Sequence, residues 1–205
     1  MSRIKLIAGL GNPGPAYAQT RHNIGADYVR HLAVHLGVSL APEARFKAEL
    51  ARVSVDGEDL RLLVPQTYMN LSGQAVGALA SFFKLTAAEI LVVYDEMVFE
   101  PGQVRLKVGG GANGHNGLRS IIESLANDAG FVRLRIGVGH PGDRSKVTPF
   151  LTSVRMPAQE RERIEARFAD VDAVLPFLVR GEINKAMNVL HANKSGDGEA
   201  AGDTL

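Results

Sequence analysis

Runs of apolar residues without alternation mark the strands that this sequence predicts to be buried. Ile4 to Ala8 forms the first run and ends at glycines and prolines. Ile90 to Tyr94 forms another, and it delivers Asp95 and Glu96 at its carboxyl end. Uninterrupted apolar runs are typical of strands that are covered on both faces. Val104 to Val108 and Val132 to Val138 are further strand candidates.

Apolar residues at helical spacing alternate with these strands. Between Thr20 and Gly37 they predict a first helix, with Gly37 as the residue after its C-cap. A helix with Pro157 as its first residue is expected to run past Leu178, and a last helix to end at His191 after Gly181. Two more helical faces carry Val76, Leu79, Ala80 and Phe83, and Leu118, Ile121, Ile122 and Leu125.

Two local signals refine this pattern. Asp56-Gly57 supplies the positive φ angles of a tight hairpin between strands at residues 50–55 and 60–64. Thr86 and Glu89 have the spacing of a capping box on a short turn. The alternation of strands and helices predicts an α/β fold.

Composition bounds the domain organisation and the compartment. With 205 residues, 45% of them hydrophobic, the chain favours one domain over residues 1–191. Residues 192–205 are small and polar, so we expect a disordered tail. The absence of cysteine excludes disulfides, thiolate zinc sites and a thiol nucleophile. The short apolar stretch at the N-terminus predicts neither a signal peptide nor a membrane span, and we expect a cytoplasmic protein.

Two glycine-rich loops suggest phosphate chemistry. Gly9 to Gly14 matches G-x-G-x-x-G after a strand, but Pro15 and a polar stretch follow where a dinucleotide-binding turn opens into a helix. Gly109 to Gly114 matches the same pattern between a strand carrying Lys107 and a predicted helix. Its backbone N–H groups are suited to bind a phosphate or a carbonyl oxygen. A flexible connection between strand and helix would have the same sequence pattern.

Histidines and asparagines at loop junctions are the other candidates. His22 lies at a loop-to-helix junction, where it is either a base or a capping residue, whereas His31 and His35 lack the glutamate of a zinc-protease helix. Asparagines at similar junctions orient carbonyls and hydroxyls, or simply form turns: Asn12, Asn70, Asn116 and, less persuasively, Asn23. No G-x-S-x-G elbow supports a serine nucleophile, which leaves activation of water.

Five segments together resemble the bacterial-type peptidyl-tRNA hydrolase family in order and spacing, over roughly residues 4–190. They are Gly9-Leu-Gly-Asn-Pro-Gly14, Tyr17-Ala-Gln-Thr-Arg-His-Asn-Ile-Gly25, Thr67-Tyr-Met-Asn-Leu-Ser-Gly73, Asp95-Glu96 and Gly114-His-Asn-Gly-Leu118. The resemblance implies a single-domain, three-layer α/β/α fold with a twisted mixed sheet. It also implies a monomeric enzyme without metal or cofactor that cleaves the ester between a peptide and the terminal ribose of tRNA.

The resemblance also implies roles for individual residues. His22 would deprotonate the attacking water, and Asp95 would hydrogen-bond the other ring nitrogen. Asn12 would distinguish blocked from free aminoacyl groups, as one of a substrate-binding set with Tyr17, Tyr68, Asn70 and Asn116. Met69 and His115 would form a supporting wall. The candidates for contact with acceptor-stem phosphates are Lys107, Arg135 and Lys146.

Two departures and three alternatives accompany this interpretation. Asn113 occupies a position usually held by glycine in the family's loop, and Val98 replaces an acid that often follows the Asp-Glu pair. Asparagine tolerates left-handed backbone, so the loop is expected to keep its shape. The alternatives are an enzyme with a nucleotide cofactor, a tRNA-binding module without catalysis, and a metal hydrolase built on His22, His115 and His140.

Overall fold

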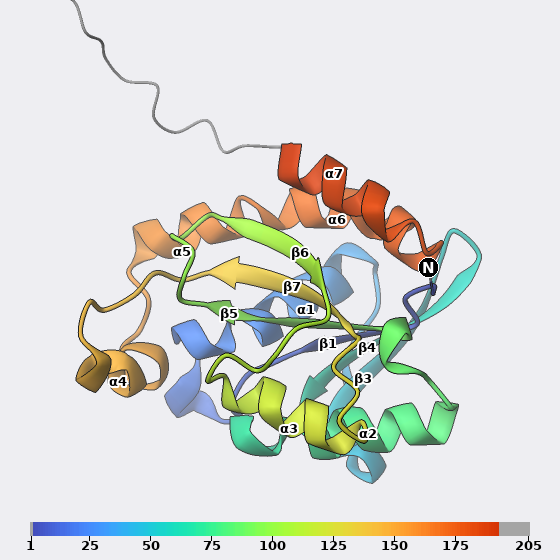
Figure 1. The fold of residues 1–205 in the computed structure, drawn as a ribbon, viewed down its shortest axis with the longest axis horizontal. Coiled ribbons are helices and arrows are strands. Elements are labelled where there is room, and N and C mark those ends of the chain that lie inside the picture. The colour runs from blue at the N-terminus through green and yellow to red at the C-terminus, as the bar shows by residue number, and fades with distance from the viewer. Residues whose placement is uncertain (1, 193–205) are drawn as a thin grey trace, which may run out of the picture.

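A seven-stranded mixed sheet organises residues 2–192, the part of the chain that the computed structural model describes (Figure 1). The strands lie in the order β2-β3-β4-β1-β5-β7-β6. Their bounds are β1 (Leu6–Gly9), β2 (Ala41–Glu43), β3 (Ala48–Val55), β4 (Glu58–Pro65), β5 (Ile90–Glu96), β6 (Val104–Val108) and β7 (Val132–Gly137). The central strands β4, β1, β5 and β7 are parallel, and the β2–β3, β3–β4 and β6–β7 pairs are antiparallel.

Helices cover both faces of this sheet. They are α1 (Ile24–His35), α2 (Ser72–Phe83), α3 (Asn116–Ser124), α4 (Val147–Thr152), α5 (Ala158–Glu165), α6 (Phe168–Val179) and α7 (Ile183–Ala192). One apolar core joins α1, α6 and α7 to the sheet, and a second joins α2 and α3 to its other face (Figure 1). The predicted three-layer α/β/α fold is therefore confirmed. Within the described residues, no helix is long and apolar enough to cross a membrane.

The local turn signals are confirmed. Asp56 and Gly57 adopt φ angles of 51° and 81° and connect the antiparallel strands β3 and β4. Thr86 and Glu89 form the expected capping box ahead of β5. The tail expected at 192–205 lies outside the described residues, apart from Ala192 at the end of α7.

The helix expected after Pro157 is wrong in two respects. Pro157 is not helical but precedes α5 with φ −55° and ψ 143°. The helix then breaks between Glu165 and Phe168, where the buried Arg167 donates to the carbonyl of Gly102 at 3.2 Å. The apolar spacing continues across this corner, so periodicity alone could not reveal it. The short elements β2 and α4 were also not predicted.

Candidate active site

The carboxyl end of β5 places Asp95 at the edge of the sheet where the loops after the parallel strands converge. The turn Arg21–Asn23, just before α1, brings His22 to the same place. This approach depends on glycine, because a Cβ on Gly25 would lie 2.2 Å from the carbonyl oxygen of Val93. The first turn of α1 therefore packs directly against the β5 backbone and holds His22 beside Asp95.

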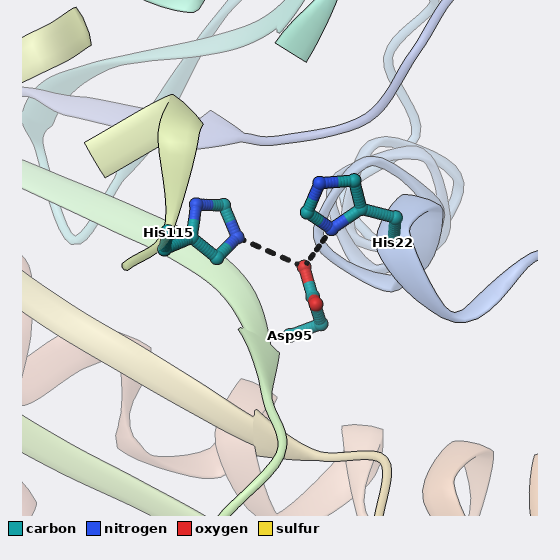
Figure 2. A group of neighbouring side chains, drawn as sticks. All are labelled: His22, Asp95 and His115. Carbon is teal, nitrogen blue, oxygen red and sulfur yellow. Dashed lines mark hydrogen bonds and ion pairs between the residues drawn. The ribbon is translucent and has the colours of Figure 1, made fainter. Parts of the chain in front are cut away.

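Three side chains meet at one oxygen atom (Figure 2). Oδ1 of Asp95 lies 2.8 Å from Nδ1 of His22 and 3.0 Å from Nε2 of His115. Asp95 and His22 are buried, with 3% and 8% of their surface exposed, so these contacts are made away from bulk water. The family resemblance predicts the pairing of His22 with Asp95 but gives His115 only a place in a supporting wall. The hydrogen bond from His115 to Asp95 instead makes His115 part of the group of side chains at the centre of the site.

The hydrogen bonds define which nitrogen of each imidazole carries a proton. Nδ1 of His115 accepts the backbone N–H of Leu118 at 3.3 Å, at the N-cap of α3, so its Nε2–H donates to Asp95. Nδ1–H of His22 donates to the same carboxylate, which leaves the lone pair of His22 on Nε2. His22 can therefore accept a proton there.

Electrostatics favour the charged forms of this pair. Burial by itself lowers the pKa of His22, but the charge of Asp95 and its hydrogen bond outweigh burial and raise the pKa above its ordinary value. Burial would raise the pKa of Asp95, yet the two neighbouring histidines hold that pKa well below its usual range. Asp95 thus stays an anion and stabilises the imidazolium form of His22.

A cavity of about 260 Å³ adjoins these side chains. α4 forms one wall with alternating apolar and hydroxyl side chains, and the glycine-rich loop after β6 forms another. The cavity thus combines a mainly apolar wall with a few polar groups, as small-molecule sites do. Its lining residues are His22, Tyr94, Asp95, Glu96, Met97, Ala112, Asn113, Gly114, His115, Asn116, Leu118, Val147, Thr148, Leu151 and Thr152.

Asn12 links the loop after β1 to the segment that opens α2. Its Oδ1 accepts the backbone N–H of Met69 at 2.7 Å. Its own backbone is held by Asn23, whose Oδ1 accepts the Asn12 N–H at 2.8 Å and whose Nδ2 donates to the Asn12 carbonyl at 2.9 Å. Asn23, the least persuasive of the four asparagines singled out from the sequence, therefore positions Asn12. Because Oδ1 of Asn12 is occupied, its amide presents Nδ2 as a donor.

The other expected substrate-binding residues lie at the surface. Tyr17 and Tyr68 pack edge to face with ring centroids 6.3 Å apart, and 57% of Tyr68 is exposed. Asn70 is exposed, and Asn116 is exposed at the cavity lining, where its Oδ1 accepts from Arg119 at 3.3 Å. Tyr17, Tyr68 and Asn70 do not line the cavity itself.

The glycine-rich loop is shaped by a residue that sequence reasoning missed. Arg133, 1% exposed, donates from Nη1 to the carbonyl of Gly111 at 2.6 Å and from Nη2 to that of Gly110. Asn113 adopts φ 49°, the left-handed conformation that was expected to be tolerated there. The only sequence signal for Arg133 was a charged residue inside an apolar strand. Val98, the other departure, is 78% exposed.

The three candidate phosphate-binding cations differ in their surroundings. Arg135 forms an ion pair with Glu96, with Nη2 3.0 Å from Oε2, and it stacks on the ring of Phe99. Lys107 is exposed at the end of β6, ahead of the glycine-rich loop. Lys146 is exposed immediately before α4. Among the residues that the structure describes, no ion pair involves Lys107 or Lys146, so both are available to a ligand.

Arg21, next to His22, is a second residue that the sequence analysis missed. Its Nη2 lies 2.6 Å from Oε2 of Glu160 on α5, and its guanidinium lies 3.9 Å from the ring centroid of Phe150 on α4. The side chain is buried. Arg21 therefore joins the turn that carries His22 to the helix that forms a wall of the cavity.

The alternatives can be set against this geometry. The loop Gly9 to Gly14 is followed by the short 3₁₀ turn Pro15–Tyr17, and α1 begins only at Ile24, so the loop does not open directly into an α-helix. His140 accepts the N–H of Gly142 and does not line the cavity, so His22, His115 and His140 form no common cluster. Within residues 2–192, the histidine and carboxylate side chains that lie close enough together to hold a metal ion are instead those of His22, Asp95 and His115.

Comparison with known proteins gives matches over almost the whole chain. A family model described as peptidyl-tRNA hydrolase matches residues 6–197. The peptidyl-tRNA hydrolase of Shewanella putrefaciens is 52% identical over 195 residues, which are 95% of this chain and 100% of that protein. The crystal structure of peptidyl-tRNA hydrolase from Acinetobacter baumannii has a TM-score of 0.89 at 42% identity, and the match covers 94% of this chain and 96% of that one.

Proposed function

This chain belongs to the peptidyl-tRNA hydrolase family, and from that premise we propose that it hydrolyses peptidyl-tRNA with His22 as the general base. The observation that supports this role most strongly is the 2.8 Å contact between Nδ1 of His22 and Asp95 beside the cavity. Only the other ring nitrogen of His22 then has a free lone pair, so water bound next to it loses its proton to Nε2. Residues 1–191 act as one catalytic domain.

The reaction balances with protein groups alone. Water gives its proton to Nε2 of His22 while its oxygen attacks the ester carbonyl that joins the peptide to the terminal ribose. The tetrahedral intermediate then collapses, the carbon–oxygen bond to the ribose breaks, and the imidazolium returns its proton to the leaving oxygen. Asp95 orients His22 and stabilises its transient positive charge, and no metal or cofactor takes part.

Asn12 accounts for selection of blocked aminoacyl groups. Its Oδ1 is bonded to the N–H of Met69, so Nδ2 is the group left to face substrate. An N-acylated residue offers a carbonyl oxygen to this donor, whereas a free α-ammonium group offers only more donors. The site should therefore prefer a peptide or N-acetyl group over a free amine. Asn70 and Asn116 hold the peptide backbone nearby, and Met69 supports Asn12.

The remaining contacts are to RNA. Tyr17 and Tyr68 pack edge to face, and the exposed ring of Tyr68 suits stacking with the terminal base. Lys107 and Lys146 contact phosphates of the acceptor stem, and Arg135 does so less directly because Glu96 already engages it. Such contacts position RNA without reading its sequence, which suits an enzyme that accepts many tRNAs. The enzyme acts as a monomer in the cytoplasm.

Release of free tRNA from two substrates tests this function. N-acetylaminoacyl-tRNA and unblocked aminoacyl-tRNA are incubated with the full chain in EDTA, and free tRNA is separated from charged tRNA. We expect rapid cleavage of the blocked ester and slow cleavage of the free one. A folded chain that binds the blocked substrate without cleaving it would instead be a tRNA-binding module. Loss of cleavage in EDTA would point to the metal hydrolase.

A further inference from the structure

Two imidazole nitrogens at the centre of the site are directed at one carboxylate oxygen, so three atoms that can bind a metal lie close together (Figure 2). One nitrogen from His22, one from His115 and one carboxylate oxygen from Asp95 all lie within 4.8 Å of one another. Two imidazoles and one carboxylate form the donor set of many catalytic zinc sites, in which a fourth position stays open to water. The cavity beside these residues supplies that fourth direction.

The spacing of these atoms is close to what a zinc ion requires. Bonds of about 2.0–2.1 Å in a tetrahedral site place neighbouring ligand atoms roughly 3.3 Å apart. The two nitrogens lie 2.8 and 3.0 Å from the carboxylate oxygen, and the three atoms lie within 4.8 Å of one another. To bind zinc, both imidazoles must rotate so that their nitrogens point at a shared ion instead of at the oxygen.

Zinc binding requires a change of tautomer in both histidines. Each imidazole moves its proton to the nitrogen that does not face Asp95, with no net release of protons. His115 thereby loses the bond it accepts from Leu118, which at 3.3 Å is near the long limit for a hydrogen bond. His22 gains a proton on Nε2, the atom that accepts the proton from water in the proposed reaction.

We propose that His22, Asp95 and His115 form a binding site for one Zn²⁺ ion, and that occupation of this site inhibits the enzyme. Borderline-soft Zn²⁺ suits imidazole ligands, whereas Mg²⁺ prefers oxygen ligands and keeps its water. Binding depends only on the geometry, but inhibition rests on the proposed function of His22. Zinc fixes the Nδ1 lone pair of His22 and leaves Nε2 protonated, so the base is lost.

A second pair of histidines must be removed before the site is measured. His31 and His35 lie four residues apart on α1, near the carboxylate of Asp172, with nitrogens 2.8 and 3.8 Å from its Oδ2. Both are more exposed than His22, so they are a competing surface site for zinc. A His31→Ala, His35→Ala double variant therefore serves as the background.

Competition with a coloured zinc chelator measures binding to the metal-stripped full chain. We expect the background variant to bind one zinc ion per chain. Adding His115→Ala should weaken binding at least ~10-fold, since even changes outside the ligand set of a metal site cost that much. His115→Gln keeps an N–H for Asp95 but removes the imidazole, so it should weaken binding equally while circular dichroism shows a native fold. Zinc affinity unchanged in both His115 variants, or absent from the background variant, would overturn the proposal.

Activity provides a separate readout. Cleavage of N-acetylaminoacyl-tRNA by the background variant should fall with the same zinc midpoint as binding, recover in EDTA, and be unaffected by Mg²⁺ at equal concentration. Faster cleavage with zinc would refute inhibition. A chain that binds zinc as expected but never cleaves the ester would refute the proposed function and leave the zinc site standing.

Discussion

At the scale of single residues, one carboxylate oxygen of Asp95 accepts hydrogen bonds from two imidazoles. The second bond, from His115, is directed by the N-cap of α3, because Nδ1 of His115 accepts the N–H of Leu118. This arrangement holds Asp95 from both sides, so the carboxylate stays aligned with His22. His22, the proposed base, is therefore positioned by a buried anion that is itself positioned by a helix terminus.

Replacing Asp95 with Asn should shift the pH dependence of the reaction. His22 must be neutral to accept a proton, and its raised pKa puts the acid limb of kcat/KM above the pH typical of an ordinary histidine. The Asp95→Asn variant lacks the charge that raises the pKa of His22, whereas burial, which lowers that pKa, remains. The acid limb of kcat/KM should therefore move to lower pH. The plateau should also fall at least ~100-fold, because an amide holds the ring less well.

Profiles of kcat/KM between about pH 5 and 9 would measure this shift, since that range spans histidine titration. Asp172→Asn is the matched control, because Asp172 also contacts a histidine at 2.8 Å but lies away from the cavity. Its acid limb should coincide with that of the unmodified chain. An unmoved limb in Asp95→Asn would mean that Asp95 does not set the pKa of the base.

Sequence motifs identified His22 and Asp95, yet they could not reveal the contacts that make the pair work. His22 and Asp95 are 73 positions apart, and the bond from His115 depends on how α3 begins. Asn23 and Arg133 were undervalued or missed because a turn asparagine and a strand arginine look ordinary until their partners are known. The His22–Asp95 hydrogen bond was expected from the family resemblance, whereas the hydrogen bonds of His115, Asn23 and Arg133 were not.

At the scale of elements, the packing of α1 on the sheet places His22 beside Asp95. Gly25 lies so close to β5 that an added Cβ would lie 2.2 Å from the Val93 carbonyl, a backbone atom that cannot move alone. Gly25→Ala should therefore lower the free energy of unfolding by ~2 kcal/mol or more, as overpacking does. Urea titration measures this loss.

Gly111→Ala provides the comparison for that measurement. Its Cβ would meet only Oδ1 of Asn113, at 3.8 Å, so we expect a change within about 0.5 kcal/mol. Equal stability of Gly25→Ala and the unmodified chain would mean that α1 can move away from β5 without cost.

The contacts that Arg21 makes between α4, α5 and the turn of His22 should affect turnover. Arg21→Met keeps much of the side-chain volume but removes the ion pair with Glu160 and the cationic contact with Phe150. We expect kcat to fall at least ~10-fold, because small displacements of positioned groups are costly in rate. Steady-state kinetics well below the unfolding temperature separate kcat from KM.

Arg161→Met is the matched variant for that experiment. Arg161 also joins α5 to a neighbouring element, through Asp27 on α1 at 3.2 Å, and it pairs within α5 with Glu165. It should lose some stability and keep its kcat. Equal loss of kcat in both variants would mean that α5 packing in general, rather than Arg21, controls the site.

Most elements were predictable because their apolar spacing was regular and their turns carried specific residues. The hairpin at Asp56-Gly57 is the clearest case, since its positive φ angles favour those residues. α4 was missed because it has only six residues, too few for periodicity to appear. This omission matters, because α4 forms a wall of the cavity.

At the scale of the whole molecule, a net charge of +1 means that attraction to RNA must come from local cations. Lys107→Ala should raise KM for the tRNA substrate and reduce the slope of log KM against log salt by about 1, the loss of one phosphate contact. Lys185→Ala is the control, because Lys185 lies on α7 and pairs with Glu182. Identical salt slopes for the two variants would exclude Lys107 as a phosphate contact.

The fold class followed from the alternation of strands and helices, but the order of strands did not. β1 lies between β4 and β5, and β6 returns antiparallel to β7 at the edge of the sheet. Such pairings depend on contacts between distant segments, which local pattern does not encode. The mixed sheet was predicted from the family resemblance, because hydrophobic periodicity does not show how strands pair.

Single-turnover cleavage of N-acetylaminoacyl-tRNA by His22→Ala tests the central claim most directly. We expect a rate at least ~100-fold below that of the unmodified chain, as for loss of a positioned base. His31→Ala should react at nearly the unmodified rate, although His31 forms the same 2.8 Å contact with a carboxylate, that of Asp172, outside the cavity. A folded His22→Ala variant that cleaves the ester at the unmodified rate would contradict the assignment of His22 as the base.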